Sequence, residues 1–510
     1  MDQIRWCERD CDIPETLDSL PPGLPETYEG VLDRISQSGV RNKTLARQAL
    51  AWLLYSPVPL QLHHLATVAC IQPPKQFTKD QKFKEKHGIL RIVPTLIYVH
   101  PDTKVVELCH FSVTQYLKSP MMSDGETRNK HHLGPNEGYE LLMRACLTYL
   151  RSPLFSEPLL SPLPLSERRK ELKRKLSDRI VLHFIFDWIN YAKKLKEDVI
   201  CGDVCEFLTD DNLASWSELW ELKVLKDYCW WQESEENIEK HEWPQDLLCE
   251  LGSSSPSRSS MGTGLYYASQ LDFPIVVAEL LKTIDPNIGG GSFISPLMVA
   301  LSDKNIRVAK ILLSNGADVD VLDQDGNTAL HKAVEENNYE IAQLLLEYHS
   351  DLRKHNKKGE AAIHLAIKRM NVESISQEFF ELLLQEPDVP DQNGKTALHL
   401  AISGNITRPI SHLLQKGANI NAVDRKGRSP LHELAVMESP EALKIFDELR
   451  IWGASTDVED DLGFTAFHWA VRKGNRPLVE HMWGRRIANS IDSDCEVCFL
   501  QIMLTQRFHK

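Results

Sequence analysis

The chain has 510 residues and a formal net charge of −14, from 58 Lys and Arg against 72 Asp and Glu. At about 100–200 residues per domain, this length predicts roughly three modules. The acidic excess provides no broad basic surface, so we expect no direct nucleic-acid binding. No apolar run approaches the roughly 18 residues of a membrane span, and the N-terminus is polar and acidic. We therefore expect a cytoplasmic or nuclear protein without a membrane segment.

The N-terminal residues predict helices followed by a β-hairpin. Residues 14–36 favour a helix, a Pro/Gly break and a second amphipathic helix, and residues 47–70 favour two helices around a Ser-Pro-Val-Pro turn. Strands are predicted over 89–100 and 104–110, joined by a turn at 101–103. This order predicts a winged-helix domain over residues 35–122.

Three segments of this region resemble a known family. LPETYEGVLDRI, AWLLYSPVPL and HFSVTQYLKS are similar to the segment that follows the nucleotide-binding domain in fungal NACHT-type, NLR-like ankyrin proteins. That segment is often called a GPI inositol-deacylase winged helix. The resemblance covers about residues 1–150 and implies that residues 1–34 are a helical remnant after a missing NACHT NTPase. It also implies that the winged helix packs against an ATPase and transmits its state.

Catalytic motifs are not found in the sequence. The only Gly-Lys-Thr, at 394–396, has Val389 where a phosphate-binding loop needs its first Gly. No G-x-S-x-G nucleophile elbow is present either, despite the name of the winged-helix family. We therefore expect no enzyme activity and no cofactor.

Residues 123–251 predict a mostly helical linker domain. Its tryptophans follow helical spacing and indicate core packing in preference to a ligand cage: Trp188, Trp216, Trp220, Trp230 and Trp231. A basic run within it has two interpretations, a nuclear-localisation signal or a solvated helix face with interleaved acidic residues. The run consists of Arg168, Arg169, Lys170, Lys173, Arg174 and Lys175. A Ser-rich linker follows over residues 252–262.

The C-terminal half contains a repeated motif. Variants of T-x-L-H-x-A begin at residues 263, 295, 328, 361, 396, 429 and 465, with spacings of 32 to 36 residues. The motif and the apolar helix after it resemble the ankyrin repeat, which is a turn and two antiparallel helices of about 33 residues. The sequence thus predicts a mainly α protein in which an ankyrin-repeat α-solenoid over 263–483 follows the winged-helix and helical half. Residues 484–510 are predicted to be a tail.

The chemistry of the motif explains its residues. Gly326 and Gly394 suit the positive φ of a tight turn, and the Thr or Ser that follows suits a helix N-cap. Ala361 replaces this Thr in the fourth repeat, and residues 370–378 carry an insertion, so we expect the fourth repeat to be the loosest.

The cysteines and histidines do not predict a metal site. The motif histidines, His331, His364, His399, His432 and His468, are one repeat apart, which is too far to share an ion, so we expect them to hydrogen-bond within their turns. Cysteine pairs at 7 and 11, 201 and 205, and 495 and 498 are isolated, whereas a structural zinc site needs four ligands.

Ankyrin arrays bind proteins through hairpin tips and first helices that line a concave face. The resemblance places there Gln324, Asp325, Asn327, Glu335, Glu336, Lys357, Lys358, Glu360, Lys368, Arg369, Gln392, Asn393, Lys395, Arg425, Lys426, Arg428, Asp461, Leu462, Phe464, Arg472 and Lys473. Acidic and basic stretches are segregated among them, so a partner should carry the complementary order of charge.

We therefore expect a non-catalytic adaptor that binds a protein partner, in a regulatory role such as transcription coregulator in a fungus. Two alternatives stay open. The chain is then either a truncated NLR-like signalling arm that acts with a separate NACHT ATPase, or a protein that binds DNA directly through its winged helix and residues 75–86.

Overall fold

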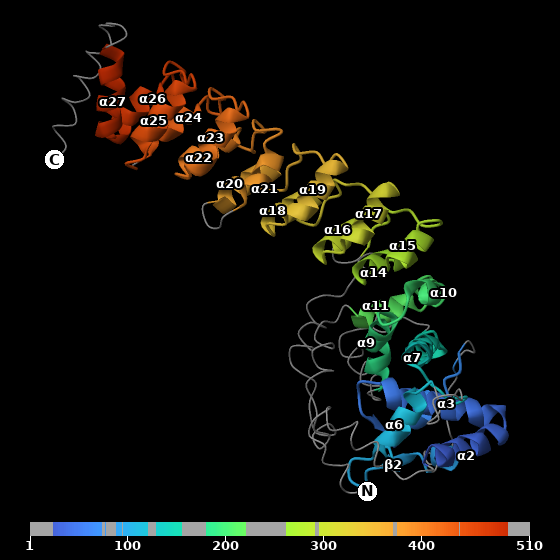
Figure 1. Cartoon of the computed structure of the whole chain (residues 1–510). Helices are drawn as coiled ribbons and strands as arrows, with labels where there is room; N and C mark the ends of the chain where they lie inside the picture. Colours follow the sequence, from blue (N-terminus) through green and yellow to red (C-terminus); the bar gives the residue numbers. More distant parts are fainter. Residues whose placement is uncertain are drawn as a thin grey trace, which may run out of the picture. The chain divides into compact units, whose positions relative to one another are not determined.

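The computed structural model describes residues 24–73, 77, 88–93, 95–120, 129–155, 180–220, 262–290, 295–370, 375–437 and 439–487. They belong to two compact units (Figure 1). The first comprises Met1–Ile284 and Gly290–Ser292, and the second comprises Asp285–Gly289 and Phe293–Lys510. The predicted basic run at 168–175, Trp230, Trp231, the linker up to residue 261 and the tail beyond 487 lie outside the described residues.

The first unit begins with helices around a small antiparallel sheet. Strand β3 (Val105–Leu108) lies between β1 (Leu60–Gln61) and β2 (Ile97–Val99), with Leu60 opposite Val106 and Tyr98 opposite Glu107. The elements are α2 (Leu24–Gln37), α3 (Val40–Tyr55), β1 (Leu60–Gln61), α4 (Leu62–Ala69), α5 (Gly88–Ile92), β2 (Ile97–Val99), β3 (Val105–Leu108) and α6 (Phe111–Lys118). The helices and the hairpin occur in the expected order, and the winged-helix assignment stays a prediction.

One predicted strand is partly wrong. Residues 89–92 form α5, and the strand begins only at Ile97. The short apolar run there does not distinguish a buried strand from a buried helical turn by its periodicity. Ile89 is fully buried, so tertiary packing decides between the two.

The helices of residues 135–220 form the core of the first unit. They are α7 (Pro135–Leu150), α9 (Ile180–Ala192), α10 (Glu197–Leu208) and α11 (Leu213–Trp220), with a 3-10 turn at Pro153–Phe155. Helix α9 is buried on nearly all sides because its sequence, IVLHFIFDWINYA, is apolar all round. Trp188 and Trp216 are fully buried with ring centroids 5.9 Å apart, as expected for core tryptophans.

The first predicted repeat belongs to this unit. Its helices, α14 (Gly264–Gln270) and α15 (Pro274–Leu280), pack on α10, so the expected linker at 252–262 does not separate two compact units. A Cβ on Gly264 would lie 2.2 Å from the Leu208 carbonyl oxygen, so only glycine permits this approach. Trp188 also stacks on Phe273, with centroids 6.3 Å apart.

Glu197, at the start of helix α10, caps the N-terminus of helix α15. Its Oε1 accepts hydrogen bonds from the backbone N–H groups of Ile275 (2.5 Å) and Val276 (2.9 Å), at the start of α15. These donors have no partner within their own helix. A carboxylate at this end also interacts favourably with the helix dipole.

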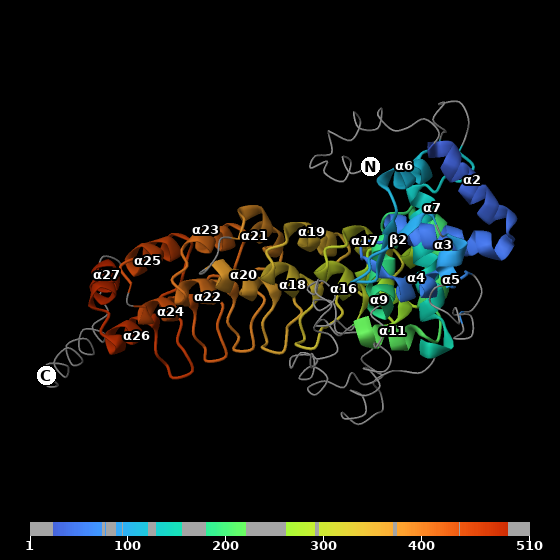
Figure 2. The same cartoon turned by 90° about the horizontal axis from the view of Figure 1, so that it is seen from below.

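The described residues of the second unit form six further helix pairs. Their first helices lie in one row and their second helices in another (Figure 2). The first helices are α16 (Pro296–Ser302), α18 (Ala329–Glu335), α20 (Ala362–Met370), α22 (Ala397–Ser403), α24 (Pro430–Val436) and α26 (Ala466–Lys473). The second helices are α17 (Ile306–Ser314), α19 (Tyr339–Glu347), α21 (Gln377–Leu383), α23 (Arg408–Gln415), α25 (Ala442–Ile451) and α27 (Arg476–Ile487). Helix α27 therefore completes the last repeat and extends past the expected boundary at 483.

Stacking between neighbours buries the repeated apolar residues. Leu330 and Leu398 are buried, and so are the small Ala333 and Ala401 that let helices approach closely. Leu434 is fully buried at the corresponding position of the sixth repeat. Because no repeat encloses its own core, each depends on its neighbours for stability.

Removing the Glu197 cap should destabilise the first unit. In Glu197→Ala two backbone donors lose their acceptor, and we expect a loss of about 1–2 kcal/mol in unfolding free energy, measured by urea titration of the full chain. Asp198→Ala is the matched control, because Asp198 is exposed in the same helical turn. Equal effects of the two variants would contradict the capping role.

Ala361 lacks the hydroxyl that caps the other first helices. Ser295 Oγ and Thr328 Oγ1 accept from backbone N–H groups three residues on, at 3.1 and 3.4 Å. Ala361→Ser should therefore stabilise the second unit by about 1 kcal/mol, raising its urea midpoint. Ala362→Ser, inside the helix, is the control and should give no gain. A lower midpoint for Ala361→Ser would show that the site has no room for the oxygen.

Candidate partner-binding surface

Five hairpins join the repeats of the second unit and share one turn geometry. They span residues 323–327, 356–360, 391–395, 424–428 and 460–464. In each, the first residue is Asp or Asn, and its Oδ1 accepts backbone N–H groups two and four residues on, as Asp424 does from Lys426 (2.8 Å) and Arg428 (3.0 Å). The glycine three residues on has φ between 67° and 80°. Sequence reasoning identified the glycine but missed the Asp or Asn, whose signal is its fixed spacing before it.

Backbone hydrogen bonds join the hairpins into one row. Lys357 N donates to Asp325 O (3.1 Å), Arg425 N to Asn393 O (2.9 Å), and Asp461 N to Lys426 O (3.0 Å). Gln392 N likewise donates to Gly359 O (2.8 Å). Figure 2 shows these loops side by side along the row of first helices. We call the five hairpins the hairpin ridge.

Three motif histidines, His331, His399 and His432, hold their first helix to the next hairpin. Thr396 N donates to His399 Nδ1 (3.2 Å), so the other ring nitrogen carries the proton and donates to Arg428 O (3.0 Å). The same pattern connects His331 to Glu360 O (2.9 Å) and His432 to Phe464 O (3.0 Å). Burial lowers the pKa of His331, His364 and His399, which favours this neutral form.

The fourth repeat departs from this pattern. Ala361 N still donates to His364 Nδ1 (3.0 Å), but His364 Nε2 makes no well-formed hydrogen bond to the following repeat. Ala361 also supplies no hydroxyl to the ring. The repeat predicted to be the loosest therefore lacks the histidine link that His331, His399 and His432 make.

Most predicted surface residues are on the ridge or the adjoining ends of first helices. The exposed ones are Gln324, Asp325, Glu336, Lys357, Lys358, Lys368, Gln392, Asn393, Arg425, Lys426, Asp461, Leu462, Phe464, Arg472 and Lys473. Glu335, Arg369, Lys395 and Arg428 are partly exposed.

Two predicted surface residues are buried. The side chain of Asn327 accepts a hydrogen bond from Asn356 Nδ2 (3.1 Å), in contact with the next hairpin. Glu360 forms an ion pair with Lys368 and has a side chain only 11% exposed. Both therefore act inside the array. The resemblance placed them by position in the motif, which does not reveal which side chains the neighbouring hairpin covers.

Two predicted cations are engaged in an internal ion network. Lys395 Nζ lies 2.8 Å from Glu433 Oε1, and an Arg428 guanidinium nitrogen lies 2.8 Å from Asp424 Oδ2 and 3.5 Å from Glu433 Oε1. Burial opposes ionisation of Asp424, but backbone N–H groups and the Arg428 guanidinium lower its pKa. These charges hold two hairpins together and leave little net charge for a partner.

Four other cations are displayed by the ridge. Lys357, Lys358, Arg425 and Lys426 are exposed, and within the described part of the chain none of them forms an ion pair. They occupy the tips of the second and fourth hairpins. The third tip, between them, carries the neutral Gln392 and Asn393. The middle of the ridge is therefore basic on a chain whose net charge is −14.

The last hairpin is apolar where the others are polar. Leu462 is 68% exposed and Phe464 is 36% exposed. The matching positions of the other four hairpins carry Asp325 and Asn327, Lys358 and Glu360, Asn393 and Lys395, and Lys426 and Arg428. The Arg472 guanidinium lies 5.9 Å from the Phe464 ring and 5.3 Å from the Trp469 ring.

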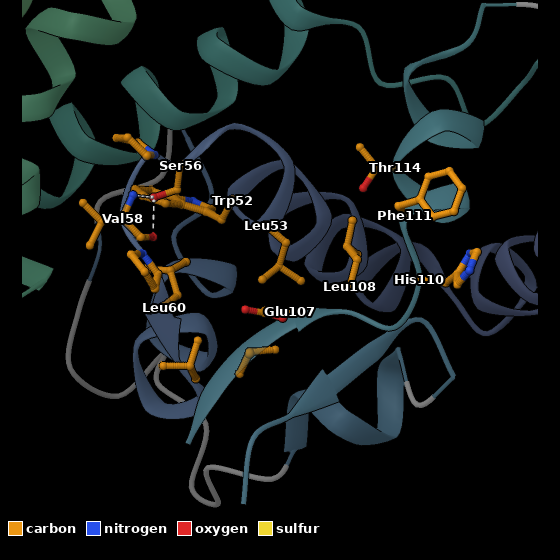
Figure 3. Close-up of a pocket in the computed structure, with 14 residues that line it drawn as sticks. Trp52, Leu53, Ser56, Val58, Leu60, Glu107, Leu108, His110, Phe111 and Thr114 are labelled. Carbon is orange, nitrogen blue, oxygen red and sulfur yellow. Dashed lines mark hydrogen bonds between the residues drawn. The ribbon is translucent and has the colours of Figure 1, made fainter. Parts of the chain in front are cut away.

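A hollow in the first unit was not foreseen from the sequence. It has a volume of about 420 Å³ and lies beside the end of α3, strand β3 and the start of α6 (Figure 3). Trp52, Leu53, Leu108 and Phe111 contribute apolar surface, and Glu107 contributes a carboxylate. Its walls combine residues of the segments AWLLYSPVPL and HFSVTQYLKS with strand β3.

Two clusters of titratable side chains in the first unit make contacts with one another inside the fold. His183 Nδ1 lies 2.6 Å from Asp187 Oδ2, and its Nε2 lies 2.7 Å from the Tyr191 hydroxyl, all inside the core of the first unit. Cys201 and Cys205 are free thiols 3.8 Å apart, and burial raises the pKa of Cys205 to about 12. No group of three or more potential metal ligands occurs among the described residues, nor does any helix long and apolar enough to cross a membrane.

The buried histidines should make stability depend on pH. Because burial lowers the pKa of His399 in the folded chain, the unfolded chain takes up the proton first as the pH falls. Stability is thus full above the ordinary pKa of 6.5 and declines as the pH falls below it. His399→Leu should cost about 1–3 kcal/mol at pH 7.5, by leaving two backbone groups unpaired, and should flatten the decline.

Urea midpoints at pH 7.5 and 5.5 provide the measurement. His349→Asn is the control, because His349 is exposed with a φ of 63°, which Asn tolerates. This control should retain both the stability and the pH dependence of the natural chain. An equal decline with pH in His399→Leu would contradict the assignment.

Comparison with known proteins agrees with the architecture of the second unit. The model of the family "Ankyrin repeats (3 copies)" matches residues 265–356, 297–385, 348–424 and 364–449. Among curated relatives, a putative palmitoyltransferase ZDHHC13 of Danio rerio is 39% identical over 100 residues, 19% of this chain and 15% of that protein. The B-cell lymphoma 3 protein homolog of Mus musculus is 33% identical over 112 residues, 22% of this chain and 23% of that protein.

Two further likenesses concern related regulators. NF-kappa-B inhibitor delta of Mus musculus is 32% identical over 125 residues, 24% of this chain and 37% of that protein. The crystal structure of the ankyrin repeat domain of Bcl-3, a member of the IkappaB protein family, is 25% identical with a TM-score of 0.38, covering 44% of this chain and 99% of that one. The chain thus spans well under half of the three curated relatives described.

The fungal NACHT-type resemblance of the first 150 residues stays a prediction, as does the missing NTPase. The repeated motif, the paired helices and the family match agree on residues 265–449. The C-terminal part of this chain is an ankyrin-repeat domain.

Proposed function

We propose that this chain is a non-catalytic adaptor that binds a protein partner through the hairpin ridge and the adjoining ends of the first helices. The observation that carries the proposal is the ridge itself. Five hairpins bonded backbone to backbone present exposed side chains in a fixed order. A surface whose backbone is already ordered loses little conformational entropy when it binds.

The polar groups beneath the ridge support a binding role in preference to catalysis. Asp323, Asp424 and Asp460 accept hydrogen bonds from backbone N–H groups of their own turns. The motif histidines His331, His399 and His432 are used between repeats. These groups are therefore occupied in holding the backbone, whereas a general base must be free to take a substrate proton.

The finer role that we propose is regulatory, such as a transcription coregulator in a fungus. Two observations support it. Relatives of the array include a protein named as an inhibitor of NF-kappa-B and a B-cell lymphoma 3 protein homolog. The N-terminal segments resemble fungal NLR-like proteins, in which an ankyrin array accompanies a signalling module.

A neutral steric block on the ridge tests the binding role. Asn393 is exposed at the central tip, its backbone bonds to the next hairpin, and its side chain makes one long hydrogen bond to Asp391 Oδ2 (3.5 Å) within its own turn. We expect Asn393→Trp to reduce recovery of the partner at least about tenfold in quantitative affinity capture from the native host, by occluding a central contact. The full chain is used in every sample.

Gln343→Trp provides the matched control, because Gln343 is exposed on the second helix α19. It should recover the same partner as the natural chain. Unchanged capture by Asn393→Trp would place the interaction elsewhere. Turnover of nucleotide or ester by the purified chain would contradict the non-catalytic role.

A further inference from the structure

We propose that the hairpin ridge binds an acidic protein segment that carries a bulky apolar side chain. The acidic residues face the tips at Lys357, Lys358, Arg425 and Lys426, and the apolar side chain packs against Leu462 and Phe464. This inference rests on the proposed function and adds the chemistry of the partner.

The charge of the hairpin ridge indicates that the partner segment is acidic. Carboxylates within and beneath the second and fourth hairpins are already paired, since Glu360 pairs with Lys368, and Asp424 and Glu433 pair with Arg428. The tip cations form no ion pair within the described residues, and Lys357 Nζ donates only to the Gln324 carbonyl oxygen (2.6 Å). These four cations are therefore available to a partner with negative charge.

Acidic residues at both ends of the ridge limit the length of this basic stretch. Asp325 is exposed at the first tip and Asp461 at the last. The favourable stretch for an acidic segment therefore runs from the second hairpin to the fourth. Like charges beyond it would disfavour a longer acidic run, which fixes the register of the partner.

The last hairpin indicates that the partner segment also carries an apolar side chain. Exposed Leu462 and Phe464 replace polar residues, and the neighbouring Trp469 is held by its Nε1, which donates to Asp460 Oδ2 (2.8 Å). The rings of Phe464 and Trp469 have centroids 6.5 Å apart. A fixed aromatic platform beside an exposed leucine is suited to an apolar anchor, the kind of contact that dominates binding energy at interfaces.

The two features lie next to one another. Asp461 N donates to Lys426 O (3.0 Å), so the basic fourth tip is bonded directly to the apolar fifth. One extended segment can therefore contact both. A nucleic acid matches the cations but leaves Leu462 and the Phe464 ring without an apolar partner, and four cations are few for a phosphate backbone. A peptide accounts for both features.

A peptide library displayed on phage tests the inference. It is panned on the full chain, and a recovered sequence is synthesised with a fluorescent label for anisotropy titration. We expect recovered sequences that combine Asp or Glu with Leu, Phe or Trp. Their affinity should fall between 50 and 500 mM salt, because exposed charges are screened.

Two ridge variants and two matched controls separate the contributions. K358E/R425E/K426E should weaken binding at least about tenfold, and L462S/F464S at least about fivefold. R307E/K310E/K444E places the same charge change on exposed residues of second helices α17 and α25. I451S/W452S removes exposed apolar residues at the end of α25. Both controls should bind within about twofold of the natural chain, and thermal denaturation verifies that each variant is folded.

Other outcomes overturn the inference in distinguishable ways. The proposed partner chemistry is wrong if the recovered peptides lack acidic and apolar residues. It is also wrong if the ridge variants bind the peptide as tightly as the natural chain does. If Asn393→Trp still abolishes capture of a native partner, the adaptor role stands without the proposed acidic and apolar partner chemistry. Displacement of the peptide by duplex DNA at 150 mM salt would favour a nucleic acid as the occupant. Failure to enrich any acidic sequence, together with unchanged capture by Asn393→Trp, contradicts both proposals.

Discussion

The link between a neutral histidine and the next hairpin is the constraint on which the array depends. In the third repeat, for example, His331 accepts the Thr328 N–H at one ring nitrogen and donates to Glu360 O from the other. Only the neutral ring does both. The helix caps that contain His331, His399 and His432 are thereby fixed to the following hairpin. Stability and surface geometry thus have the same physical origin.

Polar interactions within the ridge sort its side chains into two classes. Asn327, Glu360, Lys395 and Arg428 are used inside the array, in bonds to a neighbouring hairpin, to the same hairpin or to a first helix. Side chains at the tips themselves are left to solvent, and these include the cations and the apolar pair at the last hairpin. Charge alone is therefore a poor guide to binding residues in a stacked array. A charged side chain that is already paired inside the array contributes little to binding a partner.

The sequence alone predicted the helix pairs, the turns and the capping histidines because each depends on local spacing. Positive φ at Gly326 and N-capping by Thr328 follow from residue type and position. What it did not predict depends on contacts across the chain. Burial of Asn327 and Glu360, helical structure at 89–92, and the packing of α10 on α15 are decided by neighbours distant in sequence. The hollow beside Trp52 likewise arises from three separate elements.

The most direct test of the account is hydrogen–deuterium exchange of the full chain with and without a bound acidic peptide. The backbone amides of residues 357–358, 425–426 and 461–464 already donate hydrogen bonds within the hairpin ridge. They should exchange more slowly still when the peptide is bound, with little change in the second helices. Exchange reports opening of local structure, so an occupied ridge slows it where the peptide lies. Protection confined to the first unit, or to second helices of the second unit, would contradict the claim that the hairpin ridge is the binding surface.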